Sequence, residues 1–565
     1  MSAPKNRKPN KSILNIFFKD TEENTKKADP NAQPTKPSWW ESLIFNPAKN
    51  KSAEVIPPCC RTPNEEHFFW GMHNVPIRAA SRHLLIVGEP GSGKSVTIDL
   101  FMRSIAHRVV SQVPGRRLER MLLLDVKTTY IGFLTNIGVP IDKIIIANPF
   151  HRNTTPWRIA IDIKGEAAAV KLASILVPAE EKASTTYFWQ SSRLIITAVI
   201  VALSKAKPDT WTLRDLILAL SSPERIQRTA AHDQSSAATV RVFFNDKDHA
   251  PAIMTSIITR MQRFKTVAAL WHATKTPVEK QFSITDWLNG DGVLLMGHPP
   301  KYLESVNPIN AMLLRLICDE LQSREDVSAP HTWIVLDEFR WMKEVECMAE
   351  LLGLGRSKGA SILLGIQDFS GMKEAFGADR ADEILGLCES KTFLKVGNAT
   401  TAEWASKYFA DREATETKWS YSHSSDGTSS TTRSPDIVTR PVYLPGEFLD
   451  MVKPENLPGT RFEGIHDIPS VGGAFSTDEH APDVFALVPK PSEEHLSIYK
   501  NRDDQDLDAQ ILTDWTPEEE NEILAPIPKE SKSKEASKKE NNKSTHSEDE
   551  SQKESDIKAA LNKIF

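Results

Sequence analysis

Short apolar runs alternate with amphipathic segments from residue 83 onward. The runs carry no polar alternation, so each one predicts a strand that is buried on both faces. They span residues 83–87, 121–126, 143–146, 293–296, 333–337, 361–366 and 392–396. Helical spacing of apolar residues lies between them, as at 98–105, 308–321 and 342–356. Doubly buried strands between helices predict an α/β fold with a mostly parallel central sheet.

The strand pattern stops between residues 161 and 282, where four segments have helical spacing: 166–181, 187–205, 211–220 and 253–270. This predicts an all-α domain inserted into the α/β domain. The expected parts are a disordered, basic segment at 1–56, the first part of the α/β domain at 57–160, the inserted domain at 161–282, the second part at 283–475, and a disordered acidic tail at 476–565 with a short terminal helix.

Charge is distributed unevenly along the chain. The whole sequence has a formal charge of −6, but residues 1–56 hold ten basic and six acidic groups, and residues 476–565 hold twelve basic and 22 acidic groups. Both ends are too polar to offset chain entropy by apolar burial, so we expect them to be disordered. The Ser/Thr-rich stretch 420–434 predicts a mobile loop. The neutral middle lacks the overall basic signature of a nucleic-acid binder, although basic groups confined to a channel remain compatible with it.

The apolar run Leu194–Leu203 has about half of the ~20 residues that a membrane span needs. We therefore expect a buried helix there and no transmembrane segment. No apolar signal region follows the polar N-terminus. The five cysteines are few and odd in number, which argues against a secreted disulfide framework and indicates a cytoplasmic protein.

A phosphate-binding motif follows the first strand. Its eight residues match G-x-x-x-x-G-K-[ST]: Gly88, Glu89, Pro90, Gly91, Ser92, Gly93, Lys94 and Ser95. A strand precedes the motif and a helix follows it, as the mechanism requires. Backbone N–H groups of such a loop hold phosphate oxygens, Lys94 would reach the β- and γ-phosphates, and Ser95 would ligate Mg²⁺. The motif predicts ATP and Mg²⁺ as cofactors.

A second acidic site follows a later strand. Asp337 and Glu338 end the run at 333–337, where the first carboxylate would hold Mg²⁺ and the second would polarise the attacking water. An Asp-Glu pair after a strand is also an ordinary helix N-cap, but the phosphate loop favours the catalytic interpretation. Gln367 ends the next strand, where it would sense the γ-phosphate or remain a solvated amide. Arg356 lies in a glycine-rich bend. There it would either act as an arginine finger for a neighbouring subunit or be an ordinary surface cation.

The order of these motifs resembles the coupling proteins of type IV secretion systems, the group that includes TraD and TrwB. The resemblance rests on the phosphate loop, the helical insertion, Leu336-Asp337-Glu338-Phe339, the bend at 355–359 and the strand end at 365–368. It extends to the segments 148–150, 371–376, 400–408 and 440–445. It implies a RecA-like P-loop ATPase that assembles as a homo-hexamer. The ring would receive relaxase-bound single-stranded DNA or protein substrates and drive them to the secretion channel.

The resemblance also implies roles by position. Lys94 and Ser95 correspond to phosphate and Mg²⁺ ligands, Asp337 and Glu338 to the Walker B pair, Arg356 to the trans arginine finger and Gln367 to the nucleotide sensor. Members of this group carry N-terminal transmembrane helices, and we expect none here. We therefore expect peripheral attachment at the cytoplasmic face of the inner membrane through a partner, with residues 13–18 and Trp39-Trp40 as candidate contacts.

Two other functions fit the same residues. One is a cytosolic double-stranded DNA translocase of the FtsK/HerA type, and the other is a nucleotide-binding adaptor without motor activity that docks cargo through its acidic tail. The inserted domain supplies candidate contacts to a DNA backbone, each of which is equally an ordinary surface cation: Arg225, Arg228, Arg241, Arg260, Arg263 and Lys265.

Overall fold

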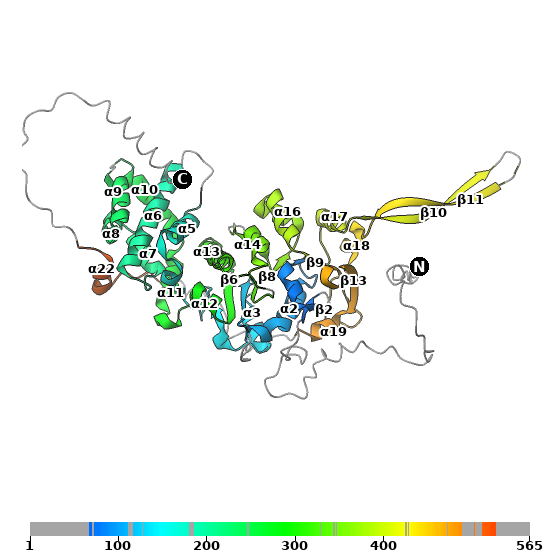
Figure 1. Ribbon diagram of the computed structural model, residues 1–565, viewed down its shortest axis with the longest axis horizontal. Helices are drawn as coiled ribbons and strands as arrows, with labels where there is room; N and C mark the ends of the chain where they lie inside the picture. The colour runs from blue at the N-terminus through cyan, green and yellow to red at the C-terminus, as the bar shows by residue number, and fades with distance from the viewer. Residues whose placement is uncertain are drawn as a thin grey trace, which may run out of the picture.

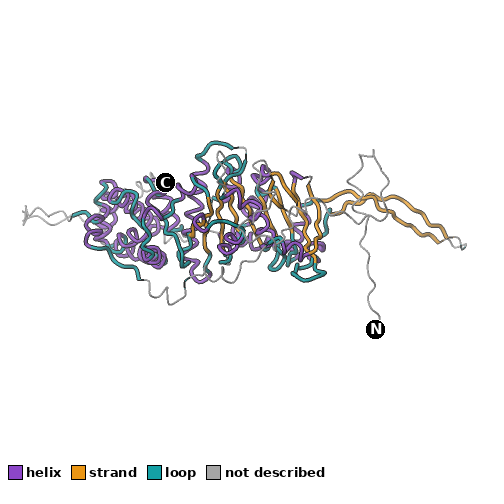
Figure 2. Tube along the Cα trace, turned by 90° about the horizontal axis from the view of Figure 1, so that it is seen from below, coloured by secondary structure: helices purple, strands orange, loops and turns teal. Residues whose placement is uncertain are grey.

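The computed structural model describes residues 67–70, 73–110, 117–126, 128–179, 186–245, 248–327, 329–342, 345, 347–423, 427, 429–471, 473–488, 502 and 511–526. The N-terminal segment 1–56, with its candidate contacts, and the expected terminal helix lie outside these residues. The described part is elongated, with a helical domain at one end, a sheet in the middle and a long hairpin projecting at the other end (Figures 1 and 2).

A nine-stranded sheet forms the centre of the molecule. Its strands, in spatial order, are β13 (Gly473–His480), β12 (Arg461–Ile468), β9 (Ser390–Phe393), β3 (Leu84–Val87), β8 (Ala360–Ile366), β7 (Thr332–Leu336), β4 (Arg120–Asp125), β6 (Gly292–Gly297) and β5 (Ile144–Ile146). The seven strands from β9 to β5 are parallel, and β12 and β13 are antiparallel to their neighbours. All seven strands predicted from apolar runs are in the parallel part.

Alternate residues of the buried strands pack into two separate cores. Leu84 and Ile86 face one core, which is closed by α2 (Lys94–Val109), α3 (Tyr130–Asn136) and α19 (Ala481–Ala486) with the β1–β2 hairpin (His67–Trp70, His73–Pro76). Leu85 and Val87 face the other. The helices over this second face are α12 (Ile284–Asn289), α13 (Leu303–Gln322), α14 (Met348–Gly355), α15 (Phe369–Phe376), α16 (Ala378–Leu387), α17 (Ala399–Tyr408) and α18 (Pro445–Asp450). Burial on both faces is why these strands read as continuous apolar runs.

The segment between β5 and β6 is helical. After α4 (Ile159–Asp162) it contains α5 (Gly165–Leu176), α6 (Thr186–Ala206), α7 (Leu213–Ala219), α8 (Pro223–Ala230), α9 (Gln234–Asn245), α10 (Ala250–Gln262) and α11 (Lys265–Ala273). The single helix expected at 253–270 is instead two helices, because the chain turns at Arg263–Phe264 to bury the Phe264 ring completely.

The helix α6 is long and apolar enough to cross a membrane by length and composition, with a mean hydropathy of 1.3 over its best window. In the described part of the chain it is alone in meeting that test. Half of that window is buried, and α6 packs against α5, α8, α9 and α10. It is therefore the core helix of the helical domain in this structure.

The stretch expected to be a mobile loop, 420–434, is mostly strand. Residues on its two sides pair in the antiparallel hairpin of β10 (Asp411–His423) and β11 (Ser429–Pro441), with Ser420 opposite Thr432. Threonines and aromatics at alternating positions suit extended backbone, which the Ser/Thr-rich composition concealed. The hairpin projects from the body, and its Tyr421 is 78% exposed (Figure 1).

The described parts of the tail contain regular structure, contrary to the disorder expected from the sequence. The boundary expected at residue 475 falls inside β13, which pairs with β12 at the edge of the sheet, and α19 follows it. Farther along, residues 511–526 include α22 (Pro517–Ile523), which lies against the helical domain (Figure 1). Apolar residues in these short segments find their burial only against other parts of the fold, which a local composition count does not register.

Candidate nucleotide-binding site

The phosphate loop connects β3 to α2. Gly91 and Gly93 have φ of +83° and +95°, a left-handed conformation that favours glycine. A Cβ on Gly93 would stand 2.6 Å from Phe462 Cε2, so β12 closes over the loop. The first turn of α2 has no acidic residue and no side-chain cap, which leaves its N–H groups and its positive dipole end available to an anion.

Lys94 joins the loop to the acidic site. Its Nζ lies 2.6 Å from Glu338 Oε1 and 3.8 Å from Asp337 Oδ1, and it donates to the Asp337 carbonyl oxygen at 3.2 Å. All three side chains are at least nine-tenths buried. The sheet order explains this meeting, because β3 and β7 are parallel and are separated only by β8, so their carboxyl ends share one edge.

Gln367 also reaches the acidic site. Its Nε2 donates to Glu338 Oε1 at 2.8 Å from the end of β8, the strand between β3 and β7. Glu338 Oε1 therefore accepts from both Lys94 and Gln367, which fixes the orientation of its carboxylate. The structure thus brings together four of the five predicted catalytic residues: Lys94, Asp337, Glu338 and Gln367.

Tyr130 is a member of this site that the sequence reasoning missed. Its hydroxyl donates to Asp337 Oδ2 at 3.2 Å, and burial, together with the Asp337 charge, raises its pKa well above the usual value. The Asp125 carboxylate at the end of β4 accepts from the backbone N–H groups of Thr129 and Tyr130, which positions the start of α3. An aspartate ending a buried strand was the available signal, since β4 is the neighbour of β7.

The remaining loop residues suit a bound polyphosphate. Among the described residues, the buried Ser92 Oγ and Glu338 Oε2 have no hydrogen-bond partner. Glu89 forms an ion pair with Lys453 at 3.2 Å, Pro90 is exposed, and Gly88 is buried, with its N–H bonded to the Ile366 carbonyl oxygen. Ser95 is the second residue of α2, directly after the loop glycines and Lys94. The donor set of backbone N–H groups, an ammonium, a hydroxyl and two carboxylates fits a nucleotide phosphate with Mg²⁺.

Arg356 lies away from this site. It follows α14 and precedes β8, whereas the phosphate loop follows the parallel strand β3. Along the seven residues of β8, the amino ends and the carboxyl ends of the parallel strands are roughly 23 Å apart, at ~3.3 Å per residue. The exposed Arg356 side chain therefore cannot serve the phosphate loop of its own chain.

Several cations of the helical domain are engaged with protein groups. Arg225 forms an ion pair with Asp514 at 2.7 Å, and Arg228 Nε donates to the Ala525 carbonyl oxygen at 3.1 Å. Arg263 donates to the Leu176 carbonyl oxygen and stacks on Phe264. A further contact joins Arg260 to Ser256, while Arg241 is exposed and Lys265 is half-buried in the first turn of α11. The expected set of DNA contacts is thus not a free basic surface.

Comparison with known proteins identifies relatives. The family model for the type IV secretion-system coupling protein DNA-binding domain matches residues 70–466. Coupling protein TraD of Escherichia coli (strain K12) is 21% identical over 347 residues, which cover 60% of this chain and 45% of TraD. The matched region therefore spans about half the length of that relative.

Solved structures of the bacterial conjugative coupling protein TrwB share the fold. The unbound form lacking 70 N-terminal residues has a TM-score of 0.56 at 18% identity, covering 74% of this chain and 89% of that chain. The complex of TrwB with ADP and Mg²⁺ has a TM-score of 0.55 at 17% identity, covering 74% and 90%. The fold is that of a RecA-like P-loop NTPase with a mostly parallel sheet and an inserted helical segment. Because the family model covers more than half of its residues, the chain belongs to the type IV secretion-system coupling protein family.

Proposed function

We propose that this protein is an ATP-hydrolysing coupling protein of a type IV secretion or conjugation system. It would recruit relaxase-bound single-stranded DNA or a protein substrate and drive it to the secretion channel. The observation that supports this best is the buried cluster of Lys94, Glu338 and Gln367 beside the phosphate loop. Structures of TrwB with ADP and Mg²⁺ and with a non-hydrolysable ATP analogue support ATP and Mg²⁺ as the cofactors.

Each residue of the cluster has a task in this mechanism. The loop N–H groups and Lys94 would hold phosphate oxygens, and Ser95 and Asp337 would hold Mg²⁺, which neutralises developing charge when bound. Glu338 would orient and polarise the attacking water. Gln367 fixes one oxygen of Glu338 and leaves Oε2 for that water.

The contact between Lys94 and Glu338 would couple binding of the nucleotide to activation of Glu338 as the general base. Phosphate oxygens that enter the loop compete with Glu338 Oε1 for the ammonium at 2.6 Å. Once Lys94 turns to the phosphate, the Glu338 carboxylate loses its ion-pair partner and is free to engage the attacking water. The base would therefore become fully active only when the triphosphate is in place.

The first test measures ATP hydrolysis with and without single-stranded DNA. We expect single-stranded DNA to stimulate the rate and Glu338→Gln to lower it by roughly 10²- to 10⁴-fold. Stronger stimulation by duplex DNA would instead favour a FtsK/HerA-type translocase, a class that the family assignment does not favour. No hydrolysis in any DNA-loaded, oligomer-promoting condition would refute the proposal.

Arg356 is proposed as a finger that acts on the site of a neighbouring subunit in a homo-hexamer. Its position at the amino-terminal edge of the sheet supports action between chains over action within one chain. Mixing Arg356→Ala protein with Lys94→Ala protein tests this, because each variant keeps what the other lacks. We expect the mixture to be more active than the sum of its parts. A mixture no more active than that sum would exclude a trans role.

For location, we propose attachment to the cytoplasmic face of the inner membrane through a partner protein. The half-buried, packed state of α6 supports this over insertion of that helix. A flotation assay with lipid vesicles checks it: the protein alone is expected to stay at the bottom of the gradient. Stable flotation without a partner would contradict it.

A further inference from the structure

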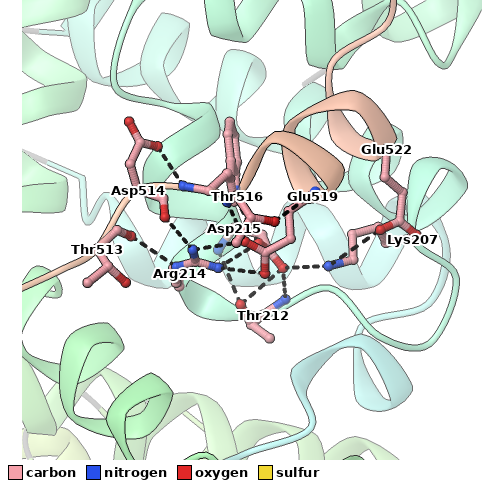
Figure 3. Close-up of polar contacts among 10 residues, drawn as sticks. Lys207, Thr212, Arg214, Asp215, Thr513, Asp514, Thr516, Glu519 and Glu522 are labelled. Atoms are coloured by element: carbon pink, nitrogen blue, oxygen red, sulfur yellow. Dashed lines mark hydrogen bonds and ion pairs between the residues drawn. The ribbon is translucent and has the colours of Figure 1, made fainter.

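Residues 511–526 lie on the helical domain, far along the chain from the residues they contact. The segment passes over α7 and α8, and α22 packs near α6 (Figures 1 and 3). It buries Trp515, Ile523 and Leu524, which are 7%, 0% and 2% exposed. A stretch with the composition of a solvated acidic linker therefore has a defined binding surface.

Arg214 on α7 forms hydrogen bonds with both the main chain and a side chain of this segment. Its Nε and Nη2 donate to the carbonyl oxygens of Thr513 and Asp514 at 3.0 and 2.7 Å. The same guanidinium forms two bonds with the Glu519 carboxylate at 3.0 and 3.1 Å (Figure 3). Only 4% of Arg214 is exposed. A planar guanidinium that meets two carbonyl oxygens and one carboxylate favours an acidic peptide with a helix start at this position, and a lysine ammonium has no such planar geometry.

Trp515 is recognised from two sides. Its indole Nε1 donates to Asp215 Oδ1 at 2.8 Å, and the Arg225 guanidinium lies 4.9 Å from the centre of its ring. Arg225 also pairs with the Asp514 carboxylate. Asp215 is 1% exposed, and its Oδ2 already accepts from Thr212, so phenylalanine in place of tryptophan would remove the indole donor from its buried Oδ1. This buried carboxylate disfavours a nucleic-acid phosphate at the same position.

The segment holds its own helix start in place at this contact. Thr516 and Glu519 form a capping box, in which the Glu519 carboxylate accepts from the Thr516 N–H at 2.9 Å, and Pro517 starts α22. The box aims the Glu519 carboxylate at Arg214. The recognised pattern is thus an aspartate, a tryptophan, a capping threonine with proline, and a glutamate four residues after the tryptophan.

We propose that α7 and α8 form a binding site for acidic, tryptophan-bearing peptides, and that residues 511–526 are its exchangeable resident ligand. The polar groups of the receptor side lie within residues 207–228, where Lys207, Arg214, Asp215, Arg225 and Arg228 contact the segment and Thr212 donates to Asp215; α6 also packs against α22. The carboxylates of Asp514 and Glu522 remain about half exposed, so water and salt reach them.

The proposal makes no use of nucleotide chemistry, and its test has a binding readout of its own. A fluorescein-labelled peptide with the sequence of residues 509–527 is titrated into three full-length chains and followed by anisotropy. The chain with Trp515→Ala and Glu519→Gln has a disabled resident segment and is expected to bind the peptide at least tenfold more tightly than wild type. Adding Arg214→Lys to that chain is expected to reduce binding at least tenfold.

The controls separate specific docking from other causes. Arg315→Lys, a matched change of an arginine outside the site, in the tail-disabled chain should leave binding unchanged, and a peptide carrying Trp515→Phe should bind at least fivefold more weakly. If Arg214→Lys lowers the melting temperature, Arg225→Gln is measured instead. Equal binding to all chains, or no binding to the tail-disabled chain, overturns the proposal. Displacement of the peptide by a single-stranded oligonucleotide as effectively as by unlabelled peptide would also overturn it, since the face would then be a general anion site.

Discussion

Replacing Glu338 with glutamine tests the buried contact at the centre of the nucleotide site. The change keeps the size of the side chain and one acceptor oxygen but removes its negative charge. In the present structure that charge faces the Lys94 ammonium at 2.6 Å, and both side chains are less than one-tenth exposed. The variant should therefore lose the general base and, at the same time, free Lys94 for a phosphate.

The expected change in nucleotide affinity follows from the burial of the Lys94–Glu338 pair. A charge-assisted hydrogen bond in such a position is worth ~1.5–3 kcal/mol, and an incoming phosphate must replace it in the wild-type protein. Without that competitor, the dissociation constant for a non-hydrolysable ATP analogue should fall by about 10- to 100-fold. Asp337 Oδ1 at 3.8 Å still holds part of the ammonium charge, which places the expectation in the lower half of that range. Turnover should fall by roughly 10²- to 10⁴-fold through loss of the base.

Calorimetric titration with the analogue and Mg²⁺ measures the binding, and phosphate release measures turnover. Glu350→Gln is the matched control, because this carboxylate is 51% exposed on α14 and pairs with Arg315. It should change neither quantity. A Glu338→Gln protein that binds the analogue no more tightly than wild type would show that the ion pair does not oppose nucleotide entry.

Three further predictions concern the loop and the sheet. Lys94→Ala should weaken nucleotide binding at least 100-fold and abolish phosphate release; retained turnover would contradict its assigned role. Gly93→Ala forces a Cβ onto a φ of +95° and to within 2.6 Å of Phe462, so the melting temperature should drop, by an amount equivalent to at least about 2 kcal/mol. Gly353→Ala, inside α14 with open space around it, should not lower the melting temperature. Burial lowers the pKa of His83 to about 4 from 6.5, so its contribution to stability is complete above pH 6.5 and is lost as the pH falls toward 4, about 3 kcal/mol in all. Urea midpoints of wild type and His83→Gln between pH 7 and 4 check this, and a difference that does not change with pH would refute it.

Local sequence determined much of the nucleotide site. The phosphate loop and the strand and helix that flank it are contiguous in sequence, so the local residues were sufficient to predict its shape. Glu338 and Gln367 were also predictable, because each directly ends an apolar run, and strands of a parallel sheet present their carboxyl ends at one edge. Tyr130 was not, because it follows its strand by several residues and reaches Asp337 only once β4 lies beside β7.

The tertiary structure decided what the tail and the hairpin become. Residues 411–423, 429–441 and 473–480 are too polar to predict strands, yet they extend because a paired neighbour satisfies their backbone hydrogen bonds. Residues 511–526 have the composition of a solvated linker, and they dock because Arg214 and Asp215, about 300 positions away, bind Glu519 and Trp515. Apolar periodicity predicts burial that repeats regularly along the chain. It does not predict the few long-range contacts that order a polar segment, because those contacts depend on which surfaces the folded domains bring together.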